Sequence, residues 1–136
     1  MADCLFCAIV AGDIPSERID EDERTVAFMD ISPATPGHAL VVPRRHSQDL
    51  FDVPADDLAA CMVSAQRVAR RAREALDAEG VNLLQSSGRA AWQTVFHFHV
   101  HVIPRYAGDP LVLPWTPAAG DPAEIARTAA TLRGDG

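Results

Sequence analysis

Three histidines alternate with apolar residues late in the chain, where His97, His99 and His101 are separated by Phe98 and Val100. Side chains at every second position of a strand share one face, so this spacing predicts three imidazoles on one side and an apolar row on the other. Neighbouring imidazoles oppose each other's protonation, so at least one is expected to be neutral near pH 7. A neutral imidazole is a nucleophile, a base or a metal ligand. The alternative is a polar sheet face open to water, with idle histidines.

Cys4 and Cys7 are a second candidate for chemistry. Two thiolates separated by two residues can bind one metal ion and supply half of a tetrahedral zinc site. A redox pair and two small core residues are the alternatives. His46 follows a predicted strand and is a candidate to join the cysteines, although a lone surface histidine is the simpler interpretation.

The elements that must position these residues follow from hydrophobic periodicity and capping signals. Strands are expected at residues 18–20, 25–29, 38–43, 81–85 and 96–104, with Pro104 ending the last one. A long helix is expected over residues 54–79, with Gly80 as its stop. Asp121 and Pro122 begin a C-terminal helix that is expected to run to about Leu132.

Composition narrows the class of protein. A chain of 136 residues with 48% apolar and 23% charged residues is typical of one soluble domain. The net charge of −7 argues against a nucleic-acid surface, and no apolar run approaches the ~20 residues of a membrane span. The N-terminus shows no secretory signal, and the odd count of three cysteines favours the reducing cytoplasm.

Polar residues near the predicted strand ends are candidate ligand contacts. Asp30 could accept hydrogen bonds from the hydroxyls of a ligand, but an Asx turn is the simpler alternative. The loop of residues 86–94 leads into the histidine strand, and its small polar groups and backbone N–H groups could surround a phosphate. Gln93 and Thr94 are the strongest candidates in this loop because they lie within four residues of His97.

The stretch of residues 93–103 resembles the signature of the histidine-triad (HIT) family of nucleotide hydrolases and transferases. Asp30-Ile-Ser-Pro and Arg44-Arg45-His46 match the family in the right order, and Cys4-x-x-Cys7 is similar to its zinc-bearing, Hint-like bacterial branch. The resemblance covers about residues 4–106 of a single domain, and leaves 107–136 as a C-terminal extension. It implies an α+β fold: a five-stranded antiparallel sheet with one long helix and a C-terminal helix, paired with a second sheet in a homodimer.

The resemblance also implies roles for individual residues. His99 would attack the α-phosphorus of an adenosine-type nucleotide to give a nucleotidyl-histidine, and water would release the monophosphate. His101 would hydrogen-bond a phosphate oxygen. The implied substrate contacts are Asp30 at the ribose, Phe28 and Ile31 at the base, and Ser86, Gln93 and Thr94 at the phosphate or leaving group. The implied ligands of a structural zinc are Cys4, Cys7, His46 and His97.

Two residues depart from the family pattern: Trp92 stands where glycine is usual, and Ser86 where asparagine is frequent. The resemblance implies that Trp92 changes the conformation of the loop and shrinks the leaving-group side of the site. The leading hypothesis is a phosphoramidase or hydrolase that acts on a purine nucleotide, with no nucleic-acid or membrane partner. The alternatives are a dinucleoside polyphosphate hydrolase, a nucleotide-binding dimer without catalysis, and a metal hydrolase that uses all three histidines as ligands.

Overall fold

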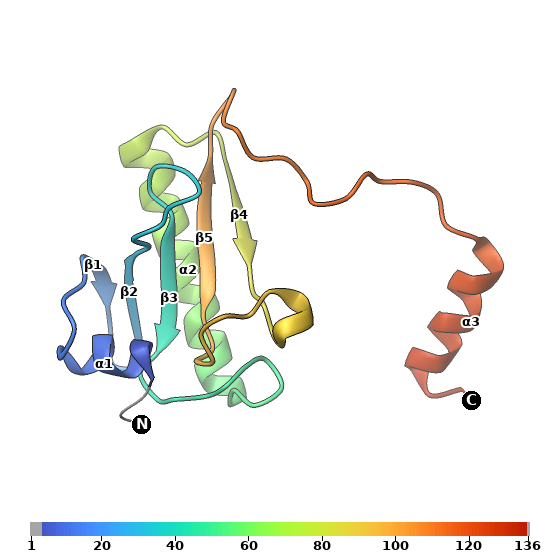
Figure 1. Ribbon diagram of the computed structural model, residues 1–136, viewed down its shortest axis with the longest axis horizontal. Coiled ribbons are helices and arrows are strands. Elements are labelled where there is room, and N and C mark those ends of the chain that lie inside the picture. The colour runs from blue at the N-terminus through green and yellow to red at the C-terminus, as the bar shows by residue number, and fades with distance from the viewer. Residues whose placement is uncertain (1–3, 136) are drawn as a thin grey trace.

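The structure, a computed structural model, describes residues 4–135, and its centre is a five-stranded sheet (Figure 1). Every neighbouring pair of strands is antiparallel. This confirms the α+β fold, and it places the histidine segment near the middle of the sheet. In sheet order the strands are β1 (Arg18–Glu21), β2 (Thr25–Met29), β3 (Ala39–Pro43), β5 (Val100–Arg105) and β4 (Gly80–Leu84).

The two faces of the sheet are covered unequally. The long helix α2 (Ala55–Leu76) packs along one face, where Cys61 and Val68 meet the apolar row of the histidine segment. Phe98, Val100 and Val102 all enter this core, as the alternation predicts. The short helix α1 (Leu5–Ala11) covers only part of the other face. The rest of that face is open, and the imidazoles of His99 and His101 line it.

The long helix ends earlier than predicted. Its last residue is Leu76, and the following Asp77 takes the left-handed conformation with φ of 57°. Aspartate tolerates this conformation, so the chain needs no glycine to leave the helix. Gly80, the predicted stop, instead begins β4, because Glu79 already donates its N–H to Arg105 O at 2.9 Å.

The histidine strand is shorter at its start and longer at its end than predicted. Strand β5 begins at Val100, because Phe98 donates its N–H to Ser47 O at 2.7 Å, in a loop rather than in a strand. Pro104 lies inside β5, paired with Val81, and does not end it. The carbonyl of Pro104 accepts from Thr35 Oγ1, so its missing N–H also faces that side and removes no bond to β4.

The C-terminal segment stands apart from the sheet. Residues 107–121 extend away from β5 and lead to α3 (Pro122–Arg133), none of whose residues is buried (Figure 1). Asp121 caps this helix and Pro122 opens it, as predicted. Within residues 4–135, none of the helices combines the length and the apolar character that a bilayer span requires.

Candidate functional site

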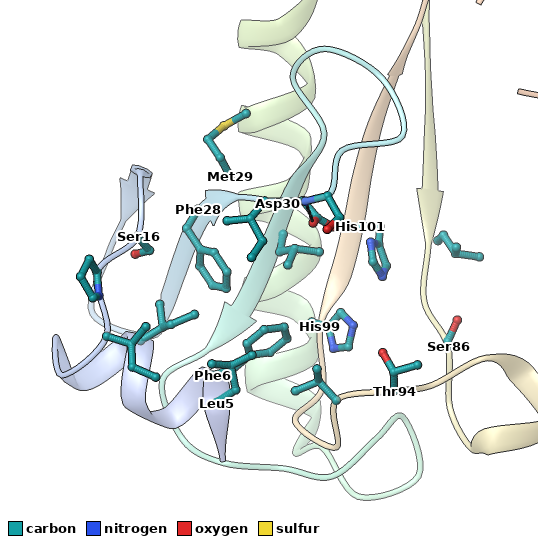
Figure 2. Close-up of a pocket in the computed structure, with 18 of the residues that line it drawn as sticks. Leu5, Phe6, Ser16, Phe28, Met29, Asp30, Ser86, Thr94, His99 and His101 are labelled. Carbon is teal, nitrogen blue, oxygen red and sulfur yellow. Dashed lines mark hydrogen bonds between the residues drawn. The ribbon is translucent and has the colours of Figure 1, made fainter. Parts of the chain in front are cut away.

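A cavity of about 500 Å³ opens on the sheet face that α2 does not cover (Figure 2). Figure 2 shows Phe6 and Phe28 on one side of His99, and Ser86 and Thr94 on the other. The cavity is therefore divided into two sides by the imidazoles. Helix α1 and β2 build the first side, and the end of β4 with the following loop builds the second.

His99 presents one defined nitrogen to this cavity. Its Nδ1–H donates to the carbonyl of His97 at 2.7 Å, because a carbonyl oxygen can only accept. In a neutral ring the lone pair is then on Nε2, the nitrogen that a nucleophile needs. Burial is the main cause that lowers the pKa of His99, so the ring is neutral at pH 7. The Phe6 ring packs against it in a T-shaped arrangement, with centroids 5.0 Å apart.

The proton positions on His38 and His101 follow from the same reasoning. Ala34 donates its N–H to His38 Nδ1 at 2.9 Å, so neutral His38 carries its hydrogen on Nε2. That Nε2 lies 2.9 Å from His101 Nδ1, which accepts. The remaining hydrogen of His101 is therefore on Nε2 and is available to donate to a ligand. Burial, with the charges of His99 and His38, lowers the pKa of His101 to about 4.

His97 faces away from the cavity and toward the two N-terminal cysteines. It is fully buried, and its Nε2–H donates to Pro43 O at 2.9 Å, which leaves the lone pair on Nδ1. This Nδ1 lies 3.4 Å from the Cys4 sulfur and 3.5 Å from the Cys7 sulfur. The three histidines therefore do not form one row of equivalent groups, as the alternation alone suggested.

Cys4, Cys7, His46 and His97 form a cluster whose ligand atoms all lie within 4.8 Å of one another. His46 Nδ1 is 3.5 Å from the Cys7 sulfur. Bond lengths of about 2.3 Å to sulfur and 2.0–2.1 Å to nitrogen at a tetrahedral angle separate such atoms by roughly 3.6 Å. The spacing of the donors thus fits a zinc ion. Burial and the Cys4 sulfur raise the pKa of the Cys7 thiol, and a bound cation would reverse this effect.

A second group of possible metal ligands, Asp30, His38 and His101, lies at the cavity. The hydrogen bond from Ala34 to His38 Nδ1 argues against a metal there. A neutral imidazole has one lone pair, and this bond uses it, so His38 Nε2 has none to offer a cation. We therefore interpret this group as a hydrogen-bonded chain and not as a metal site.

The residues proposed for the nucleoside lie together on the first side. Phe28 is buried against Phe6, and Ile31 is 97% exposed at the cavity rim. Asp30 Oδ1 accepts from Ser32 N at 2.8 Å, which is the Asx turn that the sequence also allowed. Its Oδ2 lies 3.4 Å from His38 Nε2, and Asp30 still lines the cavity. A turn and a ligand contact are thus compatible at this residue.

Of the three loop residues predicted to contact the phosphate or leaving group, Ser86 and Thr94 line the cavity and Gln93 does not. The Gln93 side chain is buried and bonded to backbone groups at both ends. Its Oε1 accepts from Gly88 N at 2.7 Å, and its Nε2 donates to Gln48 O at 2.7 Å. Gln93 therefore holds the loop in place beside the cavity.

Sequence reasoning missed His38 and Phe6 as residues of the site. His38 was assigned only to a buried strand, and it reaches His101 through the pairing of β3 with β5. Phe6 lies between the cysteines, which drew attention to the metal instead. Trp92, which the sequence analysis expected to narrow the leaving-group side, lines the cavity.

A family model described as HIT domain matches residues 11–108. An uncharacterized HIT-like protein of Mycobacterium tuberculosis is 49% identical over 108 residues, which are 79% of this chain and 75% of that protein. The adenosine 5′-monophosphoramidase of Saccharomyces cerevisiae is 39% identical over 104 residues, covering 76% of this chain and 63% of the yeast protein.

Solved structures agree with these sequence matches. A Streptococcus mutans crystal structure superimposes with a TM-score of 0.93 at 38% identity, over 99% of this chain and 86% of that one. A Zn-bound histidine triad family protein from Mycobacterium smegmatis gives a TM-score of 0.79 at 44% identity, over 99% of each chain. The first match covers the C-terminal helix as well as the sheet.

Proposed function

Because this chain belongs to the HIT domain family, we propose that it hydrolyses adenosine-type nucleotide derivatives by attack of His99 on the α-phosphorus. One observation supports this most strongly: the carbonyl of His97 holds the Nδ1–H of His99 and leaves the Nε2 lone pair at the cavity. The name of the yeast relative, an adenosine phosphoramidase, agrees with the bond type.

The first step forms a bond between His99 Nε2 and phosphorus, and breaks the bond from phosphorus to the leaving group. The leaving group takes the electron pair and a proton from the solvent. The phosphorylated imidazole then carries a positive charge, which the His97 carbonyl stabilises through the Nδ1–H. Two steps avoid a direct attack by poorly activated water on an anionic centre.

The second step returns His99 to its starting state. Water attacks the phosphorus, its oxygen stays on the nucleoside monophosphate and one of its protons returns to the solvent. The bond from phosphorus to His99 Nε2 breaks, and this nitrogen recovers its lone pair. His101 serves both steps, because its Nε2–H can donate to a non-bridging oxygen as charge develops there. His38 positions His101 by donating to the other ring nitrogen.

Substrate contacts follow from the two sides of the cavity. We assign the base to the apolar side of Phe28 and Ile31, and the ribose hydroxyls to Asp30. Ser86 and Thr94 are assigned to the phosphate. Gln93 acts through the loop, since its amide groups are already bonded to the backbone.

We propose one structural zinc ion held by Cys4, Cys7, His46 and His97. The donor spacing and the Zn-bound relative support this assignment. Bound zinc would fix helix α1 to the sheet, and α1 carries Phe6 into the cavity wall. Two reduced thiolates suit a reducing compartment such as the cytoplasm.

We also propose a homodimer formed through α2 and β4. Met62 and Val63 on the helix and Leu83 on the edge strand line one exposed apolar groove. An apolar face of this kind next to an unpaired strand edge favours association with a second copy. Light scattering should give twice the chain mass for the wild type, and Val63→Glu should reduce it to the mass of one chain.

Two substrates separate the proposed activity from its alternatives. An adenosine phosphoramidate should be hydrolysed, and His99→Gly should abolish this turnover while AMP binding persists. A diadenosine polyphosphate tests the alternative that the protein is a dinucleoside polyphosphate hydrolase, which would use the same chemistry. If neither substrate is turned over and AMP still binds, the chain is a nucleotide-binding protein without this catalysis.

A further inference from the structure

Trp92 has a backbone conformation that tryptophan rarely adopts. Its φ is 74° and its ψ is 19°, in the left-handed region where the Cβ of an L-residue is crowded and glycine is favoured. In the described part of the chain, the other non-glycine residue with positive φ is Asp77, and aspartate tolerates this region better than a bulky aromatic residue.

The turn itself does not require an indole. Trp92 donates its N–H to Arg89 O at 3.0 Å, and Gln93 donates its N–H to Gly88 O at 3.1 Å. The Gln93 side chain closes the loop by accepting from Gly88 N. All of these bonds use the backbone or Gln93, so glycine would make the same turn with less strain.

Burial of the indole does not offset this strain either. Trp92 is 64% exposed, so most of the apolar surface that makes tryptophan useful in a core remains in contact with water. Yet the residue lines the cavity together with Ser86, Thr94 and His99. A strained residue whose large side chain stays exposed in a ligand cavity indicates a role toward the ligand.

Trp92 lies on the side of the cavity where the leaving group of the substrate is expected. Ser86 and Thr94 lie across His99 from the aromatic residues Phe6 and Phe28 (Figure 2). If the nucleoside occupies the side of Phe28, the group that leaves phosphorus occupies the side of Trp92. No lysine or arginine within residues 4–135 lines this cavity, so its wall offers no cationic side chain to a polyphosphate.

We infer that Trp92 determines specificity by stacking on a planar aromatic ring of the leaving group, and that the preferred leaving group is an amine that carries such a ring. This inference rests on the proposed function. An indole face stacks on flat rings and does not hydrogen-bond them, so ring shape is what it selects. In the reaction the P–N bond breaks, the amine leaves with the electron pair and a proton, and the oxygen of water stays on phosphorus.

The test compares two adenosine phosphoramidates, whose leaving groups are phenethylamine and cyclohexylethylamine. The two amines are similar in size and basicity and differ in aromaticity. The wild type should favour the phenethylamine derivative in kcat/KM by about tenfold to a hundredfold, the range of one stacking contact. Trp92→Gly should bring this ratio near one, and Trp92→Phe should retain most of it. Trp115→Ala is the matched control and should retain the full ratio.

Other outcomes decide against the inference. If Trp92→Gly lowers kcat/KM equally for both substrates, Trp92 only supports the structure of the loop. If the ratio of the two kcat/KM values is unchanged, the indole does not contribute to specificity. If a diadenosine polyphosphate reacts faster than the phenethylamine derivative and this advantage disappears in Trp92→Gly, the stacked ring is a second base and the amine assignment is wrong.

Fluorescence separates a failure of the inference from a failure of the proposed function. Trp115→Phe leaves Trp92 as the sole tryptophan of the chain. Even if no substrate is turned over, the phenethylamine derivative should quench this indole more strongly than the cyclohexylethylamine derivative does. Equal quenching would overturn the stacking contact. A higher melting temperature of Trp92→Gly would show that the variant is folded and that strain has been relieved.

Discussion

His97 and His99 are two residues apart, both buried, and each donates one ring hydrogen to a backbone carbonyl. They differ in which nitrogen donates. His97 uses Nε2 toward Pro43 and keeps the Nδ1 lone pair for the cysteine cluster, whereas His99 uses Nδ1 toward His97 and keeps the Nε2 lone pair for the cavity. The backbone therefore prepares two similar side chains for different proposed roles, His97 as a metal ligand and His99 as a nucleophile.

The largest expected effect comes from removing the nucleophile. His99→Ala should lower kcat/KM for an adenosine phosphoramidate at least about a thousandfold, because no other group forms the covalent intermediate. Zinc content and melting temperature should stay close to those of the wild type. A loss below tenfold in steady-state kinetics would show that His99 is not the nucleophile.

For His97, the proposed zinc ligand, we expect a loss of metal and of stability. His97→Ala should lose the zinc ion and lower the free energy of unfolding by more than about 3 kcal/mol, since bound metal contributes directly to folding. Elemental analysis and urea denaturation measure the two quantities. Cys61→Ala is the control, because Cys61 lies in the core away from the cluster and its loss should leave zinc bound. Zinc-free His97→Ala with unchanged stability would contradict a structural zinc site.

A smaller effect is expected at His38, which acts through His101. His38→Ala removes the donor that orients the His101 ring, and kcat should fall by about tenfold to a hundredfold. His38→Gln places an amide N–H near the position of Nε2 and should recover part of this loss. Equal activity of the two variants would show that the volume of the ring, and not its hydrogen bond, is what matters.

The smallest expected effect is the contribution of His101 to the pH dependence of the free energy of unfolding. Histidines of the unfolded chain take up protons below about pH 6.5, whereas burial lowers the pKa of native His101 to about 4. The native state then binds fewer protons, so the free energy of unfolding should fall between about pH 6.5 and pH 4 and be insensitive to this group above pH 6.5.

As the pH falls to 5, the free energy of unfolding measured by urea denaturation should decrease less in His101→Gln than in the wild type. An equal decrease in both proteins would show that His101 does not cause it.

The pH dependence of the rate should also reflect burial, in this case burial of His99. Burial lowers the pKa of His99, so the acid limb of kcat/KM should lie below the ordinary value of about 6.5.

Local signals in the sequence predicted the parts of the fold that depend on near neighbours. The apolar alternation of Phe98, Val100 and Val102 and the capping residues Asp121 and Pro122 gave the correct core face and the correct start of α3. Backbone conformations that depend on contacts between distant parts of the sequence could not be predicted in this way. The start of β5 depends on a bond from Phe98 to Ser47, and the Gln93 side chain ties the loop before β5 to the carbonyl of Gln48.

The candidate site was predictable where residue types are rare and grouped, as in the cysteine pair and the histidine segment. Its hydrogen-bonded chain was not, because His38 and His101 are 63 residues apart and meet only through strand register. The orientation of Gln93 was equally hidden, since its partners are backbone atoms of Gly88 and Gln48. Which nitrogen of each histidine is free depends on its partner in the folded chain, which is a backbone group for His38, His97 and His99 and the His38 ring for His101.

Mass spectrometry of the rapidly mixed enzyme tests the assignment of nucleophile to His99 most directly. The reaction with an adenosine phosphoramidate is stopped in base, because a nucleotide joined to imidazole is sensitive to acid. We predict one nucleoside monophosphate on His99 itself, located by fragmentation of its peptide, transient in the wild type and missing in His99→Ala. Turnover without any adduct, or an adduct on His97 or His101, would contradict the account.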